Sequence, residues 1–235
     1  MIYIVENELD ANVKAKGARI RAVFLDFDGV VVDSERIYQR FWKEAFEAYG
    51  YKTTPSILLS LRSCEAKSGE KIMRTIYGSA FPYLEIRKLR SSLMDEYVKS
   101  HPYQLKKGVL DFLAFLKERE IAAFIVSSSY KEKIEKEIKR LGISSFFSDV
   151  LSAKDVKNGK PYPDVYLKAI ELSGFAKEEI IVIEDSPNGI CSAFGAGLKV
   201  IMADDIDKAS KETSKMIIGE VSEIDELINH PFFLR

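Results

Sequence analysis

The sequence contains few cysteines. Only two of its 235 residues are cysteines, Cys64 and Cys191, and neither belongs to a CxxC pair. We therefore expect no disulfide framework and no cysteine-ligated zinc site. This cysteine usage suits a reducing compartment, and we expect a cytoplasmic protein.

The sequence also lacks a long apolar segment and an excess of either charge. No run approaches the ~18 consecutive apolar residues that span a bilayer, and the first residues, MIYIVENELD, become acidic too early for a secretory signal. Lys and Arg total 35 against 36 Asp and Glu, so no net field recruits nucleic acid or an anionic membrane. We expect a soluble monomer whose partner is a small molecule.

Short apolar runs of strand length recur along the chain and alternate with helical patterns. Four runs are clear and two are fainter: Ile20–Leu25, Ile121–Val126, Ile180–Ile183 and Lys199–Met202, then Phe147–Leu151 and Met216–Ile218. Helical spacing lies between most of them, as in Tyr130–Leu141, where Gly142 follows as a stop signal. Buried strands that alternate with helices predict an α/β fold with a doubly wound parallel sheet.

One region breaks this alternation. From Ser34 to about Tyr103 the sequence shows helical patterns and no convincing strand, although a crossover between parallel strands needs only ~30 residues. We therefore predict an α-helical domain, residues 34–105, inserted into a discontinuous core of residues 1–33 and 106–235. Residues 1–19 receive no assignment.

Two carboxylates, Asp26 and Asp28, end the first apolar run, and Gly29 follows at once. Residues i and i+2 of a strand point to the same side, and the carboxyl ends of parallel strands face the crevice where open α/β sheets bind ligands. An Asp-rich turn is the alternative. Because adjacent carboxylates repel one another unless a cation lies between them, we expect a hard cation, above all Mg²⁺.

Polar residues follow two later segments. Ser127–Ser129 join the second strand to the next helix, where they could cap that helix through Ser129 or cradle a phosphate oxygen. Lys160 lies in the loop NGKPYPD. A loop lysine is commonly a solvated charge, but a stiff Gly and Pro frame would suit a lysine that is aimed at an anion. Asp164 is expected to be the N-cap of the following helix.

A second acidic pair, Glu184 and Asp185, ends the run Ile180–Ile183. Carboxylates at the ends of two strands can converge on one cation at the edge of the sheet. Helix capping is the alternative, and it accounts for one of the two acids more easily than for both.

Taken in order, the four segments resemble the motifs of the haloacid dehalogenase superfamily, in the branch with a helical cap after the first motif. DFDGVVVDS is similar to its nucleophile motif, IVSSS to its phosphate-binding motif, NGKPYPD to its lysine motif and IEDSPNG to its metal motif. The resemblance covers the chain from about Arg21 to about Asp204. Four motifs in the right order are far more specific than any one of them.

The resemblance implies chemical roles for both acidic pairs. Asp26 would be the nucleophile that forms an aspartyl-phosphate, and Asp28 the general acid and base. Asp26, Asp185 and the main-chain carbonyl of Asp28 would bind Mg²⁺, with Glu184 bound directly or through water. A phosphorylated metabolite is the implied partner.

The resemblance also implies a phosphate cradle and a source of selectivity. Ser127, the backbone amide of Ser128 and Lys160 would hold the phosphoryl oxygens, and closure of the cap would exclude water. Arg62 lies in a stretch that family members often use to contact substrate. A solvent-exposed arginine is the alternative.

Within this family, hydrolysis of a small phosphate monoester, such as a sugar phosphate, is the favoured reaction. The dehalogenase branch lacks the second aspartate, which is present here as Asp28. Phosphomutase relatives carry a histidine on the first cap helix, where this sequence has Tyr38; its histidines, His101 and His230, lie elsewhere. A β-phosphoglucomutase-like enzyme and a catalytically silent phospho-ligand-binding protein remain the alternatives.

Overall fold

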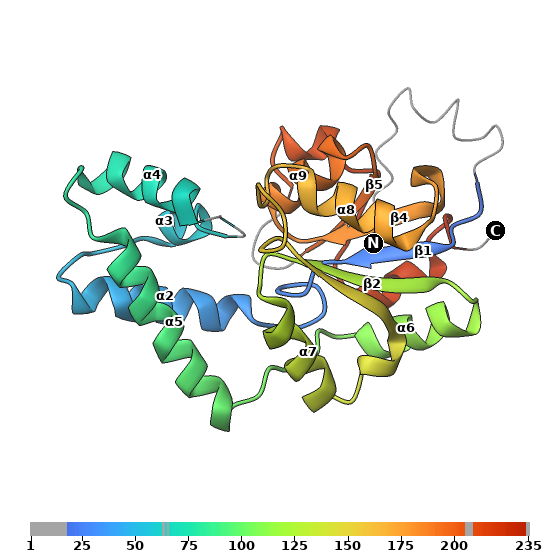
Figure 1. The fold of residues 1–235 in the computed structure, drawn as a ribbon, viewed down its shortest axis with the longest axis horizontal. Helices are drawn as coiled ribbons and strands as arrows, with labels where there is room; N and C mark the ends of the chain where they lie inside the picture. Colours follow the sequence, from blue (N-terminus) through green and yellow to red (C-terminus); the bar gives the residue numbers. More distant parts are fainter. Residues whose placement is uncertain (1–17, 63, 65, 205–208, 234–235) are drawn as a thin grey trace. The chain divides into compact units, whose positions relative to one another are not determined.

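The computed structural model describes residues 18–233 except residues 63, 65 and 205–208 (Figure 1). The chain divides into two compact units. One contains the described residues before Asp33 and after Gln104, and the other is Asp33–Gln104. The N-terminal segment that received no assignment lies almost wholly outside the described residues.

The first unit is built on a six-stranded sheet. Its strands are β1 (Ala22–Leu25), β2 (Ala122–Ser127), β3 (Phe147–Ser152), β4 (Ile180–Glu184), β5 (Lys199–Ala203) and β6 (Gly219–Val221). They are ordered β3-β2-β1-β4-β5-β6, and every neighbouring pair is parallel. This confirms the predicted α/β fold class with a parallel sheet.

Helices cover both faces of this sheet (Figure 1). They are α6 (Val109–Glu118), α7 (Lys131–Arg140), α8 (Asp164–Ser173) and α9 (Pro187–Gly195), with short 3₁₀ helices η1 (Ser144–Phe146), η2 (Lys177–Glu179), η3 (Thr213–Lys215) and η4 (Ile224–Asn229). Alternate strand residues such as Phe24 and Val182 pack with Tyr166 and Ile190 in one core cluster. Each such side chain contributes about 1.5–3 kcal/mol by its burial.

The strand register places the chemistry-bearing residues at one edge of the sheet. Leu25 lies opposite Ile125 of β2 and Ile183 of β4. The residues that follow, Asp26 and Glu184, are therefore at the same level, at the carboxyl ends of two neighbouring central strands.

The second unit is helical. It contains α2 (Glu35–Ala48), α3 (Pro55–Leu59), α4 (Ala66–Tyr77) and α5 (Tyr83–Ser100), and its described residues form no strand. It has its own core, in which the ring of Trp42 stacks on Tyr83 with centroids 5.9 Å apart and Phe46 packs on Phe81. On another side of α2, Phe41 packs edge-on against Tyr97, so the wide apolar stripe of this helix is buried on two faces.

The position predicted for the last strand was wrong by three residues. The run Met216–Ile218 precedes β6, which pairs with β5 from Gly219, opposite Ile201. The 3₁₀ turn Thr213–Lys215 continues into Met216, whose N–H donates to the Thr213 carbonyl, and the Ile218 N–H then donates to the Val200 carbonyl at 2.8 Å, directly before the β6 ladder.

Within the part of the chain that the structure describes, no helix combines the length and the hydropathy that crossing a membrane requires.

Candidate active site

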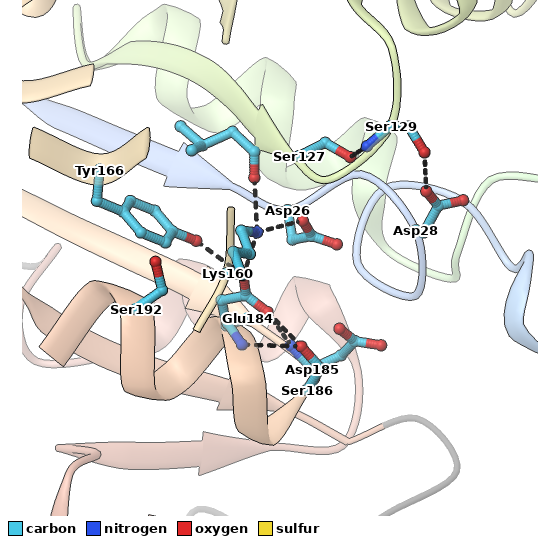
Figure 2. Close-up of polar contacts among 12 residues, drawn as sticks. Asp26, Asp28, Ser127, Ser129, Lys160, Tyr166, Glu184, Asp185, Ser186 and Ser192 are labelled. Carbon is cyan, nitrogen blue, oxygen red and sulfur yellow. Dashed lines mark hydrogen bonds and ion pairs between the residues drawn. The ribbon is translucent and has the colours of Figure 1, made fainter. Parts of the chain in front are cut away.

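Asp26 lies at the centre of a buried polar cluster at the carboxyl edge of the sheet (Figure 2). Its N–H donates to the Ile183 carbonyl of the neighbouring strand at 3.0 Å, which fixes the main chain where β1 ends. Ligand atoms of Asp26, Glu184 and Asp185 all lie within 4.8 Å of one another, and all three residues are buried. Asp26 at one strand end and the pair Glu184 and Asp185 at another therefore converge, as the sequence predicts.

Lys160 is the cation of this cluster. Its side chain is fully buried, and Nζ donates to Asp26 Oδ1 at 2.6 Å, to Glu184 Oε1 at 2.5 Å and to the Val126 carbonyl at 2.9 Å. An ammonium group has three protons, so each is used. The interpretation of Lys160 as a solvated surface charge is excluded.

The loop that carries Lys160 is held at both ends by side-chain hydrogen bonds. Asp164 Oδ1 accepts from the main-chain N–H of Asn158 at 3.1 Å and from its side-chain amide at 2.8 Å. Ser192 of α9 donates to the Tyr162 carbonyl. The prediction that Asp164 is an N-cap was wrong: Pro163 occupies the cap position, and Asp164 secures the loop behind it.

The electrostatics of the cluster favour a bound cation. Burial raises the pKa of Asp26 to about 8; attraction to Lys160 opposes that rise, while repulsion from Glu184 and Asp28 adds to it. Burial would lower the pKa of Lys160, but the two carboxylates beside it outweigh this effect and raise it. Among the described residues, Lys160 contacts two of three carboxylates that lie within 4.8 Å of one another, and carboxylate oxygens are the ligands that Mg²⁺ prefers. The residues present therefore fit Mg²⁺.

Asp28 is separate from this cluster and is held by a serine. Ser129 Oγ donates to Asp28 Oδ2 at 2.8 Å (Figure 2). The alternative that Ser129 caps the following helix was wrong, because Tyr130 is the cap residue of α7 and no side-chain hydrogen bond is made there. The Ser129 side chain instead links the serine segment after β2 to the acidic segment after β1 by this hydrogen bond.

The serine segment after β2 forms a hydrogen-bonded loop. Ser127 is buried, and its Oγ accepts from the main-chain N–H of Ser129 at 3.1 Å. The Ser129 carbonyl in turn accepts from Ser152 Oγ, at the end of β3, at 2.7 Å. Ser128 lies between the two fixed residues. Its backbone amide is thus in a segment of defined conformation, next to Ser129, whose hydroxyl contacts Asp28.

Three residues of this site have no place in the sequence-based prediction: Tyr166, Ser186 and Gly189. The Tyr166 hydroxyl donates to Glu184 Oε1 at 2.8 Å. Ser186 caps α9 by accepting from the Gly189 N–H at 3.1 Å, and its hydroxyl donates to Glu184 Oε2 at 3.2 Å. A Cβ at Gly189 would overlap the Glu184 carboxyl group. Two signals were available in the sequence: the tyrosine among the apolar residues of α8, and Ser186 before Pro187, which is a helix N-cap pattern.

Arg62 and Tyr38 lie in the helical unit. Arg62 is buried, and its Nε is 3.2 Å from Glu35 Oε2, so the alternative of a solvent-exposed arginine was wrong. The guanidinium of Arg90 lies 5.0 Å from the Tyr38 ring centroid and 4.7 Å from that of Trp42, which places Tyr38 in a packed aromatic and cationic group. Contact of either residue with substrate stays a prediction.

Comparison with known proteins identifies relatives along most of the chain. The model of the haloacid dehalogenase-like hydrolase family matches residues 23–203. The chain is 27% identical over 186 residues to a phosphorylated carbohydrates phosphatase of Thermotoga maritima, covering 77% of this chain and 84% of that one. It is 26% identical over 190 residues to the pyrophosphatase PpaX of Halalkalibacterium halodurans, covering 77% and 81%.

A solved structure shares the fold. CbbY from Rhodobacter sphaeroides, crystallised in complex with phosphate, aligns with a TM-score of 0.72 and 21% sequence identity, covering 88% of this chain and 96% of that one.

Proposed function

Because the chain belongs to the haloacid dehalogenase-like hydrolase family, we propose that it is a Mg²⁺-dependent phosphatase that hydrolyses a small phosphate monoester through a phosphoryl group on Asp26. The observation that carries this proposal is the buried contact of Lys160 with both Asp26 and Glu184, beside Asp185. This arrangement combines a carboxylate nucleophile, a cation for the phosphoryl oxygens and oxygen ligands for a metal ion.

In the first step, an Asp26 carboxylate oxygen attacks phosphorus, and the bond between phosphorus and the ester oxygen breaks. Asp28 gives its proton to the departing alkoxide. The hydrogen bond from Ser129 holds Asp28 in place for this transfer. The alcohol leaves, and the phosphoryl group remains on Asp26.

In the second step, Asp28 is a carboxylate and takes a proton from water. That water attacks phosphorus, the bond to Asp26 breaks, and inorganic phosphate leaves. Ser127 and the Ser128 amide hold the phosphoryl oxygens in both steps, and the positive charge of Lys160 beside Asp26 stabilises the negative charge on them.

Asp26, Asp185 and the main-chain carbonyl of Asp28 would hold Mg²⁺, with Glu184 reaching it directly or through water. Bound Mg²⁺ would act as a Lewis acid that offsets negative charge on the phosphoryl oxygens and on Asp26.

The substrate class rests on the relatives and on the helical unit. One relative is a phosphatase of phosphorylated carbohydrates, which supports a sugar phosphate or a similar metabolite as substrate. We propose that Asp33–Gln104 is the cap domain that selects this substrate and that Arg62 contacts it.

Product analysis separates hydrolysis from phosphoryl transfer back to a sugar. With Mg²⁺ and a panel of phosphorylated metabolites that includes β-glucose 1-phosphate and its bisphosphate, we expect release of inorganic phosphate. A mutase needs a cap group that handles a hydroxyl proton near neutral pH. Histidine, with an unperturbed pKa of ~6.5, does this, whereas tyrosine at ~10 stays protonated, and the family resemblance assigns Tyr38 to that position.

Two measurements on the same samples distinguish the outcomes. Phosphate is quantified by colorimetry and glucose 6-phosphate by a coupled dehydrogenase assay. Accumulation of glucose 6-phosphate with little free phosphate would identify a mutase. The absence of turnover across the panel, with binding of phosphate esters retained, would identify a silent binding protein.

A further inference from the structure

Tyr166 contacts two of the essential side chains without taking part in the proposed reaction. It lies on α8, six residues after Lys160, and it is wholly buried. Its hydroxyl donates to Glu184 Oε1 at 2.8 Å, and the Lys160 ammonium lies 5.2 Å from the centroid of its ring. Figure 2 shows the phenol directed from α8 toward Lys160 and Glu184.

The Glu184 carboxylate receives four hydrogen bonds. Oε1 accepts from Lys160 Nζ at 2.5 Å and from the Tyr166 hydroxyl. Oε2 accepts from the Asp185 N–H and from Ser186 Oγ, each at 3.2 Å. These four donors lie around both oxygens and fix the plane of the carboxyl group.

Three of these four donors also belong to other features of the site, whereas the Tyr166 hydroxyl donates to Glu184 alone. Lys160 also contacts Asp26, the Asp185 N–H belongs to the strand end, and Ser186 caps α9. Without the phenol, Oε1 would have Lys160 as its one remaining donor. Nζ and Oε1 are already 2.5 Å apart, so the Glu184 carboxyl group would turn together with the Lys160 ammonium, and Lys160 would move relative to Asp26.

We propose that Tyr166 is a positioning residue: its hydroxyl holds Glu184 so that Lys160 stays on Asp26 and the three carboxylates keep the spacing that a divalent cation requires. This inference rests on the proposed function and extends it to a residue outside the reacting groups. Partners that orient metal-binding carboxylates affect metal affinity or activity by about 10- to 100-fold when they are removed.

The test is Tyr166→Phe, which deletes one oxygen and keeps the ring in the core. We expect the Mg²⁺ dissociation constant of the substrate-free protein, measured by calorimetric titration, to rise about tenfold. We expect kcat to fall by about the same factor while KM changes little, because Tyr166 does not touch substrate. The matched control is Tyr77→Phe, which removes a phenol that donates to the Lys52 carbonyl in the helical unit and should leave Mg²⁺ affinity unchanged.

The metal titration decides the proposal without reference to turnover. A Mg²⁺ affinity of Tyr166→Phe equal to that of the unmodified protein would overturn it, even if the melting temperature fell, because that result describes a packing role alone. If the unmodified protein hydrolyses no phosphate ester, the proposed function fails, while the comparison of Mg²⁺ affinities still determines the role of Tyr166.

Discussion

Asp26→Asn should abolish phosphate release, with a loss in kcat of more than about a thousandfold. An amide cannot replace the carboxylate as a nucleophile toward phosphorus, and it is a weaker ligand for Mg²⁺. The measurement is the rate of phosphate release at saturating Mg²⁺ and saturating substrate, so that weakened metal binding does not imitate loss of the nucleophile.

The fold should tolerate this substitution. Asparagine has nearly the same shape, and burying a neutral amide costs less desolvation free energy than burying a carboxylate. Lys160 keeps two acceptors, Glu184 Oε1 and the Val126 carbonyl. The melting temperature should therefore stay close to that of the unmodified protein. The matched control, Asp111→Asn on the exposed side of α6, should retain full activity. Substantial turnover by Asp26→Asn would show that another group attacks phosphorus.

Removal of divalent metal should eliminate activity, and Mg²⁺ should restore it, whereas Ca²⁺ should not. The ligand atoms of Asp26, Glu184 and Asp185 lie within 4.8 Å of one another, and the Lys160 ammonium contacts the first two of these residues. Mg²⁺ requires octahedral coordination at about 2.0–2.1 Å, while Ca²⁺ takes six to eight ligands at about 2.3–2.6 Å. The larger ion would displace Asp26 from the line of attack on phosphorus.

Phosphate release is measured after dialysis against excess chelator and then after addition of each metal ion. Asp185→Asn provides a matched variant, because it removes one carboxylate that the proposal assigns to the metal. It should raise the Mg²⁺ concentration needed for half-maximal activity. If the rate of phosphate release were undiminished in excess chelator, the assignment of Asp185 as a metal ligand needed for activity would be wrong.

The parallel sheet could be predicted because its strands are short apolar runs that are buried on both faces. β1 contains only apolar residues and is followed directly by Asp26, and β4 is apolar up to its last residue, Glu184. These patterns locate both strands and their carboxyl ends. The convergence of Asp26, Glu184 and Asp185 follows from parallel register and needs no knowledge of helix packing. The positions of these three carboxylates depend on local sequence and on the rule that open parallel sheets bind ligands at the carboxyl ends of their strands.

The contacts of Tyr166 and Ser129 could not be predicted in this way. The Tyr166 hydroxyl reaches Glu184 only because α8 packs against the sheet at a particular angle and height, which tertiary contacts set. Ser129 satisfies the pattern of a helix cap equally well, and the choice of Asp28 as its acceptor depends on a loop 101 residues away in sequence. β6 was misplaced because an apolar run marks burial and does not show where ladder pairing begins.

The most direct test of the central claim is to trap the phosphoryl group on the protein. Enzyme turning over a phosphate ester labelled at phosphorus is quenched in acid, which preserves acyl phosphates, and is then digested and mapped by mass spectrometry. We expect the label on the peptide that contains Asp26, and we expect it to disappear in Asp26→Asn. Rapid turnover with no label on Asp26, or with label on another residue, would contradict the proposed mechanism.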